Sequence, residues 1–326
     1  MKSVKIKIIF FIVAILGLII CFIWSLNTGS IKIPLPKLLI HFFSDDSQIN
    51  IIKDLRLPRI LIAMLSGAAL TVSALLLQVI SKNDLAEAGF LGISASAEFA
   101  YLLVILIVPQ FLQLNLLISV LFSLATALLL FYLSMVNQQH LNALIIFGVA
   151  LNACFTGINQ ILNQFLSTGS QGTIMSGLGQ KTWQEVKLLL LIVGLAIGIS
   201  IFLSHWCNIL RLPTATLHSL GVPVFQYSAI FLVLAVALAA ATVVMMGVIS
   251  FLGLIVAHIC RKLVGNDYRL LLPFGSLVGA TFLLTADTIG RSWFLPIEIS
   301  ANNILLMIGG ISLLIVFINR RQAFEN

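Results

Sequence analysis

Four polar side chains recur along one apolar stretch, and their types and spacing suggest a chemical role. They lie in the run 141–166 at steps of 4, 3 and 4 residues, which places them on one face of a helix: Asn152, Thr156, Asn159 and Asn163. Amide groups are costly in lipid unless they face protein or water. The stripe therefore predicts the lining of a substrate pathway, with hydrogen bonding between helices as the alternative.

Three arginines form a second candidate site. Arg56 and Arg59 flank Pro58 at the start of an apolar run, and Arg291 follows Asp287 by four residues near the end of a later one. The four-residue spacing predicts an ion pair on one helix. If the three arginines share a rim, their guanidinium groups would suit bidentate capture of carboxylates. Simple neutralisation of Asp287 by Arg291 is the alternative.

We expect no metal site, cofactor site or catalytic constellation. The five histidines and four cysteines are dispersed, without ligand spacing. His258 has no second ligand at helical spacing, so a structural role is favoured. No phosphate-binding loop motif is present, and an ATPase, if one is used, must be a separate chain. We therefore expect a protein that is not an enzyme.

Membrane-spanning helices must position these residues. The 326 residues are 60% hydrophobic and only 9% charged, whereas soluble domains carry about 25% charged residues. A span needs roughly 20 apolar residues, and only helices or closed barrels satisfy the backbone in lipid. Ten continuous apolar runs occur, at 6–26, 57–80, 91–108, 114–136, 141–166, 187–206, 227–247, 248–263, 271–290 and 303–319. The prediction is an all-α polytopic membrane protein with about ten transmembrane helices in a single domain, 1–326.

The net charge of +7 reflects topology signals rather than nucleic-acid binding. Ten spans place both termini on one side. With that side cytoplasmic, basic residues number ten inside and eight outside, and five of those eight lie between Lys32 and Arg59. Without that segment the count is ten against three, which favours cytoplasmic termini. The excess in the segment is explained by docking of an acidic partner, or by interface anchoring.

The segment from Leu210 to Tyr227 is too short and polar to span, and the topology places it inside. Pro213 and Pro223 bracket a stretch suited to short helices, and Gly221 suits a helix stop. A plain connector would usually be only a few residues long. The segment is therefore interpreted as a contact for a soluble partner.

Several long motifs resemble one family, the iron-siderophore, haem and vitamin B12 uptake permeases of type II ABC importers (FecCD type). The resemblance covers nearly the whole chain. It rests on RLPR at 56–59, the stretch to Ala97, SGLGQKTW at 176–183, the block from Gly247 to Pro273, Ala286–Arg291 and Pro296–Glu298. Ala257, Ser300 and Ile311 depart from the family pattern, where proline is usual, and Asn302 from its usual glycine.

The resemblance implies the partners and the sites. Two permease subunits, identical or different, are expected to pair around a central pathway in the bacterial cytoplasmic membrane, above two cytoplasmic ATPases. An extracytoplasmic substrate-binding lipoprotein is expected to dock its acidic residues onto Arg56, Arg59 and Arg291. The pathway-lining helix would carry the asparagine stripe. The ATPase coupling loop would comprise Thr214, Leu217, His218, Leu220 and Gly221.

The resemblance implies an importer that moves an iron chelate, either a ferric siderophore or haem, by alternating access. A cobalamin importer of the same family is one alternative. An ion-coupled secondary transporter is another, and it would need a carboxylate buried mid-membrane. Glu98, near the start of the third span, is the residue to examine for that role.

Overall fold

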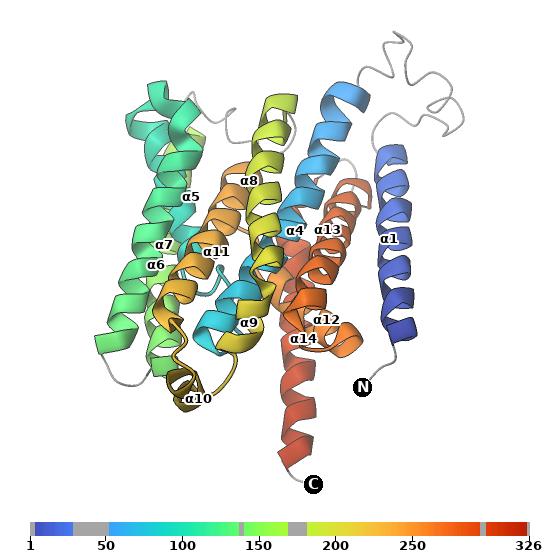
Figure 1. The fold of residues 1–326 in the computed structure, drawn as a ribbon. Helices are drawn as coiled ribbons and strands as arrows, with labels where there is room; N and C mark the ends of the chain where they lie inside the picture. Colours follow the sequence, from blue (N-terminus) through green and yellow to red (C-terminus); the bar gives the residue numbers. More distant parts are fainter. Residues whose placement is uncertain (1–3, 29–51, 137–139, 169–180, 294–297, 325–326) are drawn as a thin grey trace.

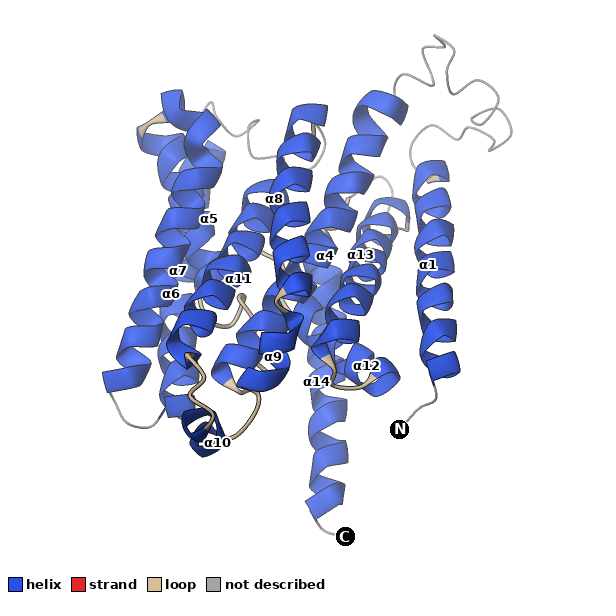
Figure 2. Ribbon diagram, viewed as in Figure 1, coloured by secondary structure: helices blue, strands red, loops and turns tan. Residues whose placement is uncertain are grey.

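The computed structural model describes residues 4–28, 52–136, 140–168, 181–293 and 298–324. Throughout these residues the secondary structure is helical, with no strand (Figure 2). The long helices are α1 (Val4–Asn27), α4 (Leu57–Ser81), α6 (Asn115–Val136), α7 (His140–Thr168), α8 (Trp183–Phe202), α11 (Val224–Met246), α13 (Tyr268–Ser292) and α14 (Ala301–Phe324). The shorter ones are η1 (Ile52–Arg56), α5 (Ile93–Ile107), η2 (Pro109–Leu114), α9 (Ser204–Leu210), α10 (Thr214–Ser219) and α12 (Leu252–Val264).

Each of the ten apolar runs coincides with one main helix, and the run 187–206 also includes the start of α9. Six helices among the described residues are long and apolar enough to cross a membrane: α1, α4 with part of η1, α6, α8, α11 and α13. The helices α5 and α12 have 15 and 13 residues. At 1.5 Å per residue both are shorter than the roughly 30 Å hydrocarbon core. The all-α membrane fold is confirmed, and crossings beyond these six stay a prediction.

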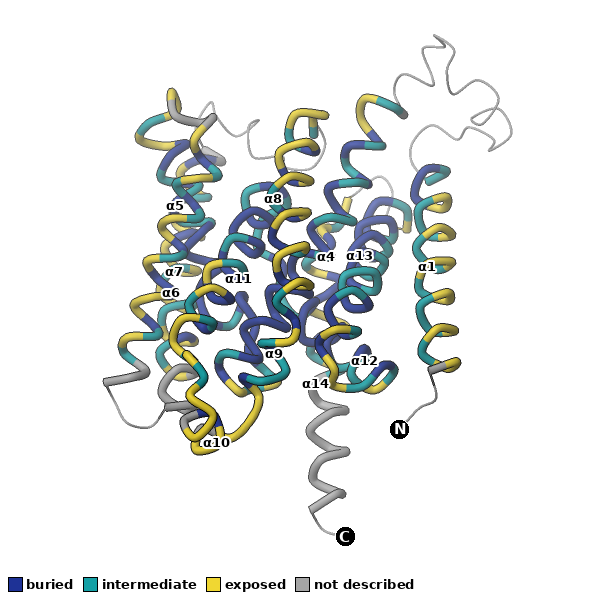
Figure 3. Tube along the Cα trace, in the orientation of Figure 1, coloured by how far each residue is buried: buried dark blue, intermediate teal, exposed yellow. Residues whose placement is uncertain are grey.

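Helix α4 lies at the centre of the bundle, against α11 and α13 (Figures 1 and 3). Over its most apolar stretch 83% of the residues are buried, whereas α1 has no buried residue in the corresponding stretch and packs on the core only with half-buried side chains such as Phe11. Small residues make this position possible. A β-carbon added at Gly67 would collide with the backbone of Gly279 on α13, so the two backbones are in close contact there.

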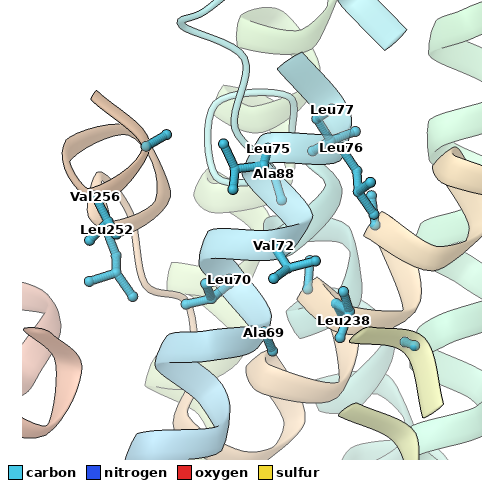
Figure 4. Close-up of a cluster of buried hydrophobic side chains, with 14 of the residues drawn as sticks. Ala69, Leu70, Val72, Leu75, Leu76, Leu77, Ala88, Leu238, Leu252 and Val256 are labelled. Carbon is cyan, nitrogen blue, oxygen red and sulfur yellow. The ribbon is translucent and has the colours of Figure 1, made fainter. Parts of the chain in front are cut away.

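The core around α4 is formed by large aliphatic side chains from three helices. Leu70 and Leu76 of α4 lie with Leu238 of α11 and with Leu252 and Val256 of α12 (Figure 4). All five are buried. The central helix is therefore fixed by packing on several sides, and the residues at its two ends have defined positions.

The predicted break between the seventh and eighth apolar runs is confirmed. Helix α11 ends at Met246, and Gly247 adopts φ 78°, a conformation that favours glycine. Helix α1 begins and α14 ends at the same end of the bundle, where α10 also lies (Figure 1). The opposite end carries Arg56 and Arg59 at the start of α4, and we call it the arginine end.

Candidate functional site

Two of the three arginines, Arg59 and Arg291, meet around one buried carboxylate at the arginine end. Arg59 donates from Nε (3.3 Å) and from its terminal nitrogen (3.1 Å) to Asp287 Oδ1. Arg291 approaches Asp287 Oδ2 with Nε at 3.0 Å, as an ion pair without hydrogen-bond alignment. Asp287 is 2% exposed. The predicted pair within α13 is confirmed, and Arg59 of α4 joins it.

Two of these arginines also fasten α1 to the bundle. Arg291 donates to Ser25 Oγ (2.8 Å), and Arg56 donates to the Leu26 carbonyl (3.2 Å). Arg56 and Arg291 are 8% and 7% exposed. Buried charges are stable only when paired and hydrogen-bonded. These two side chains therefore hold the cluster in place, and neither is openly displayed to a partner.

Glu298 supplies the exposed part of this cluster. Its Oε2 accepts from the remaining terminal nitrogen of Arg59 at 3.1 Å, and its side chain is 60% exposed. Sequence reasoning included Glu298 in a motif but assigned it no role. A carboxylate directly after an apolar segment was the available signal. The basic residues Lys32 and Lys37 of the predicted docking segment lie outside the described residues.

The asparagine stripe lies against α5. Asn159, 2% exposed, donates to the Ala95 carbonyl and to Glu98 Oε2, both at 2.9 Å. Asn152 lies beside Gly92, where an added β-carbon would meet its backbone. These contacts fit hydrogen bonding and close packing between helices, the alternative that the sequence left open.

Thr156 lies at the edge of the stripe and is exposed, as are Gln160 and Gly157 on the adjoining face of α7. Asn163 is half-buried. The exposed face of α7 in this chain therefore carries Thr156 and Gln160, and the asparagines lie beside it, closer to α5. The assignment of the pathway itself stays a prediction.

The predicted coupling loop forms helix α10. Leu217 is 1% exposed and packs inward, whereas Leu220 is 62% exposed. Gly221 follows with φ 64°, and the helix ends at Ser219, as the predicted stop requires. Thr214 and His218 belong to the same helix by backbone, and their side chains lie outside the described part.

A polar network closes the end of the bundle near α10. Arg261, in the last turn of α12, donates to Gln78 Oε1 (2.6 Å) and to the Tyr268 hydroxyl (3.1 Å). It also pairs with Asp84 at 2.8 Å. The Arg211 guanidinium lies 5.7 Å from the centre of the fully buried Tyr268 ring. The network ties the α4–α5 connection to α12 and α13.

Glu87, in the same connection, caps helix α12. Its carboxylate accepts from the backbone N–H groups of Phe251 and Gly253, both at 3.1 Å, and it is 2% exposed. These bonds satisfy two N–H groups at the start of α12 that would otherwise be buried without an acceptor. Sequence reasoning missed the cap, because its partners lie more than 160 residues away.

Comparisons with known proteins agree with this architecture. The model of the FecCD transport family matches residues 17–319. A relative from Staphylococcus aureus (strain MSSA476), named "Probable heme-iron transport system permease protein IsdF", is 38% identical over 287 residues, or 88% of each chain. The same protein from strain Newman matches equally well.

Two solved structures also resemble the chain. One is an ABC transporter of the metal-chelate type in an inward-facing conformation, with a TM-score of 0.78, 27% identity and coverage of 95% of this chain and 99% of the other. The second, PsaBC from Streptococcus pneumoniae in complex with Fab, has a TM-score of 0.60 at 14% identity, covers 87% and 95%, and supports the fold alone. The chain belongs to the FecCD transport family.

Proposed function

We propose that this chain is the membrane permease subunit of an ABC importer for an iron chelate, with haem as the favoured cargo. The observation that carries the proposal is the match to a haem-iron permease over 88% of both chains. The permease provides a pathway and performs no covalent chemistry. ATP hydrolysis by two separate subunits is the energy source.

The proposed topology has ten crossings with both termini in the cytoplasm. Four crossings then come from α5, α7, α12 and α14. Short crossing helices are tolerated where the neighbouring backbone is buried in protein. The residues Ala86–Ile93 before α5 meet this condition, since almost all of them are buried, and the residues 247–251 before α12 are buried or half-buried. The arginine end is then extracytoplasmic and α10 is cytoplasmic.

The proposed docking site for an extracytoplasmic binding protein centres on Arg59, with Arg56 and Arg291 holding the cluster together. Asp287 occupies one side of the Arg59 guanidinium and Glu298 the other. A carboxylate of the binding protein therefore reaches Arg59 by displacing Glu298, the exposed member. This exchange keeps the buried charges paired throughout docking.

The test of docking is Glu298→Gln, which removes the competing charge. We expect tighter association of the binding protein, by up to about fivefold, since an exposed competing pair contributes about 1 kcal/mol at most, and weaker association in Arg59→Gln. Lys187→Gln is the matched control, an exposed cation on α8. Unchanged affinity in both Glu298→Gln and Arg59→Gln would remove docking from this cluster.

The proposed pathway lies between this chain and a second permease subunit, on the face of α7 that carries Thr156 and Gln160. The asparagines behind it hold α7 against α5. On the cytoplasmic side, the proposed ATPase contact is the exposed side of α10, where Leu220 is 62% exposed, together with Phe225 just after it, at 68%. Large apolar side chains exposed beside a polar loop are typical of a protein contact.

Alternative cargoes and energy sources make different predictions. A cobalamin importer would share every feature described so far, so only uptake separates it from an iron importer. An ion-coupled carrier would need a buried carboxylate free to exchange its ion. Glu98 instead accepts a hydrogen bond from Asn159, which favours a structural role.

The experiment that tests the cargo is uptake by a deletion strain complemented with this chain. Labelled haem, several ferric siderophores and cobalamin are compared in parallel. The proposal predicts that haem uptake falls in the deletion strain and returns on complementation. Loss of cobalamin uptake alone would contradict the iron assignment.

A further inference from the structure

A polar cavity lies at the α10 end of the bundle, separate from the arginine cluster. Its volume is about 300 Å³, at the lower end of the roughly 300–1,000 Å³ typical of ligand pockets. It is lined by the last turn of α4, the residues that follow it and the residue after α9: Gln78, Lys82, Asn83, Asp84, Leu85 and Arg211. Nothing in the proposed transport cycle uses this cavity.

Both amides in the lining have their oxygens engaged and their nitrogens available. Gln78 is 3% exposed; its Oε1 accepts from Arg261, and its buried Nε2 has no partner among the described residues. Asn83 Oδ1 accepts a hydrogen bond from the Leu85 N–H at 3.0 Å, which leaves the Asn83 amide nitrogen available to donate to a ligand. A buried donor without an acceptor costs free energy unless a ligand or water satisfies it.

The cations in the lining lack carboxylate partners within the described chain. Lys82 donates only to the Leu212 carbonyl (2.9 Å), and Arg211 only lies over the Tyr268 ring. Partial burial lowers the pKa of Lys82 through desolvation of its ammonium group. The lining's single carboxylate, Asp84, is already paired with Arg261 at 2.8 Å.

We propose that this cavity binds an oxyanion of the phosphate class. Its lining offers two amide nitrogens and two cations that have no carboxylate partner among the described residues, and its one carboxylate, Asp84, is paired with Arg261. Arginine and lysine with amide donors are the groups that recognise phosphate oxygens. The volume accommodates a phosphate together with a small substituent, as in a free phosphate ester or in the headgroup of an anionic phospholipid. These two sources share one chemistry, and the experiment separates them.

The test uses the permease–ATPase complex without nucleotide in phosphatidylcholine nanodiscs. Inorganic phosphate is titrated by calorimetry at constant ionic strength, and phosphatidylglycerol retention is measured in parallel by native mass spectrometry. The variants are Arg211→Gln and Lys82→Gln, both at exposed positions where the fold should persist. Arg269→Gln is the control, an exposed arginine at the same end that contacts His205 instead.

We expect saturable binding that weakens about tenfold in each cavity variant, the loss expected for one charge-assisted hydrogen bond, and stays unchanged in the control. Phosphate binding identifies a free anion as the source, and lipid retention alone identifies a headgroup; either supports the proposal. Absence of both, or equal effects of all three variants, would overturn it. Binding to the isolated permease that disappears in the complex would also overturn it, since the cavity would then be an ATPase contact.

Discussion

Replacing Asp287 by asparagine tests whether the buried carboxylate holds the arginine end together. Asp287 is 2% exposed and faces Arg59 and Arg291, whose side chains are 12% and 8% exposed. Removing one partner of a buried ion pair costs about 3–5 kcal/mol, because the other charge stays buried and unpaired. In Asp287→Asn, Arg59 keeps its ion pair with Glu298, and Arg291 keeps its hydrogen bond to Ser25 Oγ. We therefore expect the lower part of that range, about 3 kcal/mol.

The assay is reversible unfolding in mixed detergent micelles, followed by tryptophan fluorescence. Glu298→Gln is the control within the same cluster, since its carboxylate is 60% exposed and exposed pairs contribute about 0–1 kcal/mol. The double variant Asp287→Asn/Arg291→Gln should recover part of the loss, because it removes one stranded cation. The reasoning is refuted if Asp287→Asn unfolds no more easily than Glu298→Gln.

Two further predictions concern the other side of the bundle. Glu87 is 2% exposed and accepts from the N–H groups of Phe251 and Gly253, so Glu87→Ala, which leaves both buried donors without an acceptor, should lower the free energy of unfolding by about 2–3 kcal/mol. Glu87→Gln keeps one acceptor oxygen and should cost less; unfolding in mixed micelles measures both, and unchanged stability in Glu87→Ala would exclude the cap. Leu220→Asp should weaken ATPase pull-down while changing stability by less than about 0.5 kcal/mol, and Ser219→Asp on the same exposed helix is the control; normal pull-down and uptake in Leu220→Asp would count against the contact.

Local patterns in the sequence predicted those features that depend on neighbouring residues. Continuous apolar runs predicted the helices and the break between 227–247 and 248–263, Gly221 predicted a helix end, and the four-residue spacing predicted the Asp287–Arg291 pair. Each of these follows from residues within about one or two helical turns. The stripe on α7 was also placed correctly on one helical face.

The contacts that define the sites depend on residues far apart in the sequence. Arg59 meets Asp287 across 228 residues, and Arg291 meets Ser25 across 266. Whether a polar stripe faces a pathway or a neighbouring helix depends on how closely α5 approaches α7. Helix periodicity gives the direction of a side chain and leaves open what covers it, so the burial of Arg56 and Asn159 could not be predicted.

The most direct test of the proposed function is transport by the reconstituted complex. The permease, its ATPase and its binding protein are assembled in liposomes, and haem accumulation is measured with ATP, with a non-hydrolysable analogue, and with an imposed proton or sodium gradient. The account predicts haem accumulation that requires both hydrolysable ATP and the binding protein. Accumulation driven by the ion gradient without ATP, or ATP-driven accumulation of cobalamin and not of haem, would contradict it.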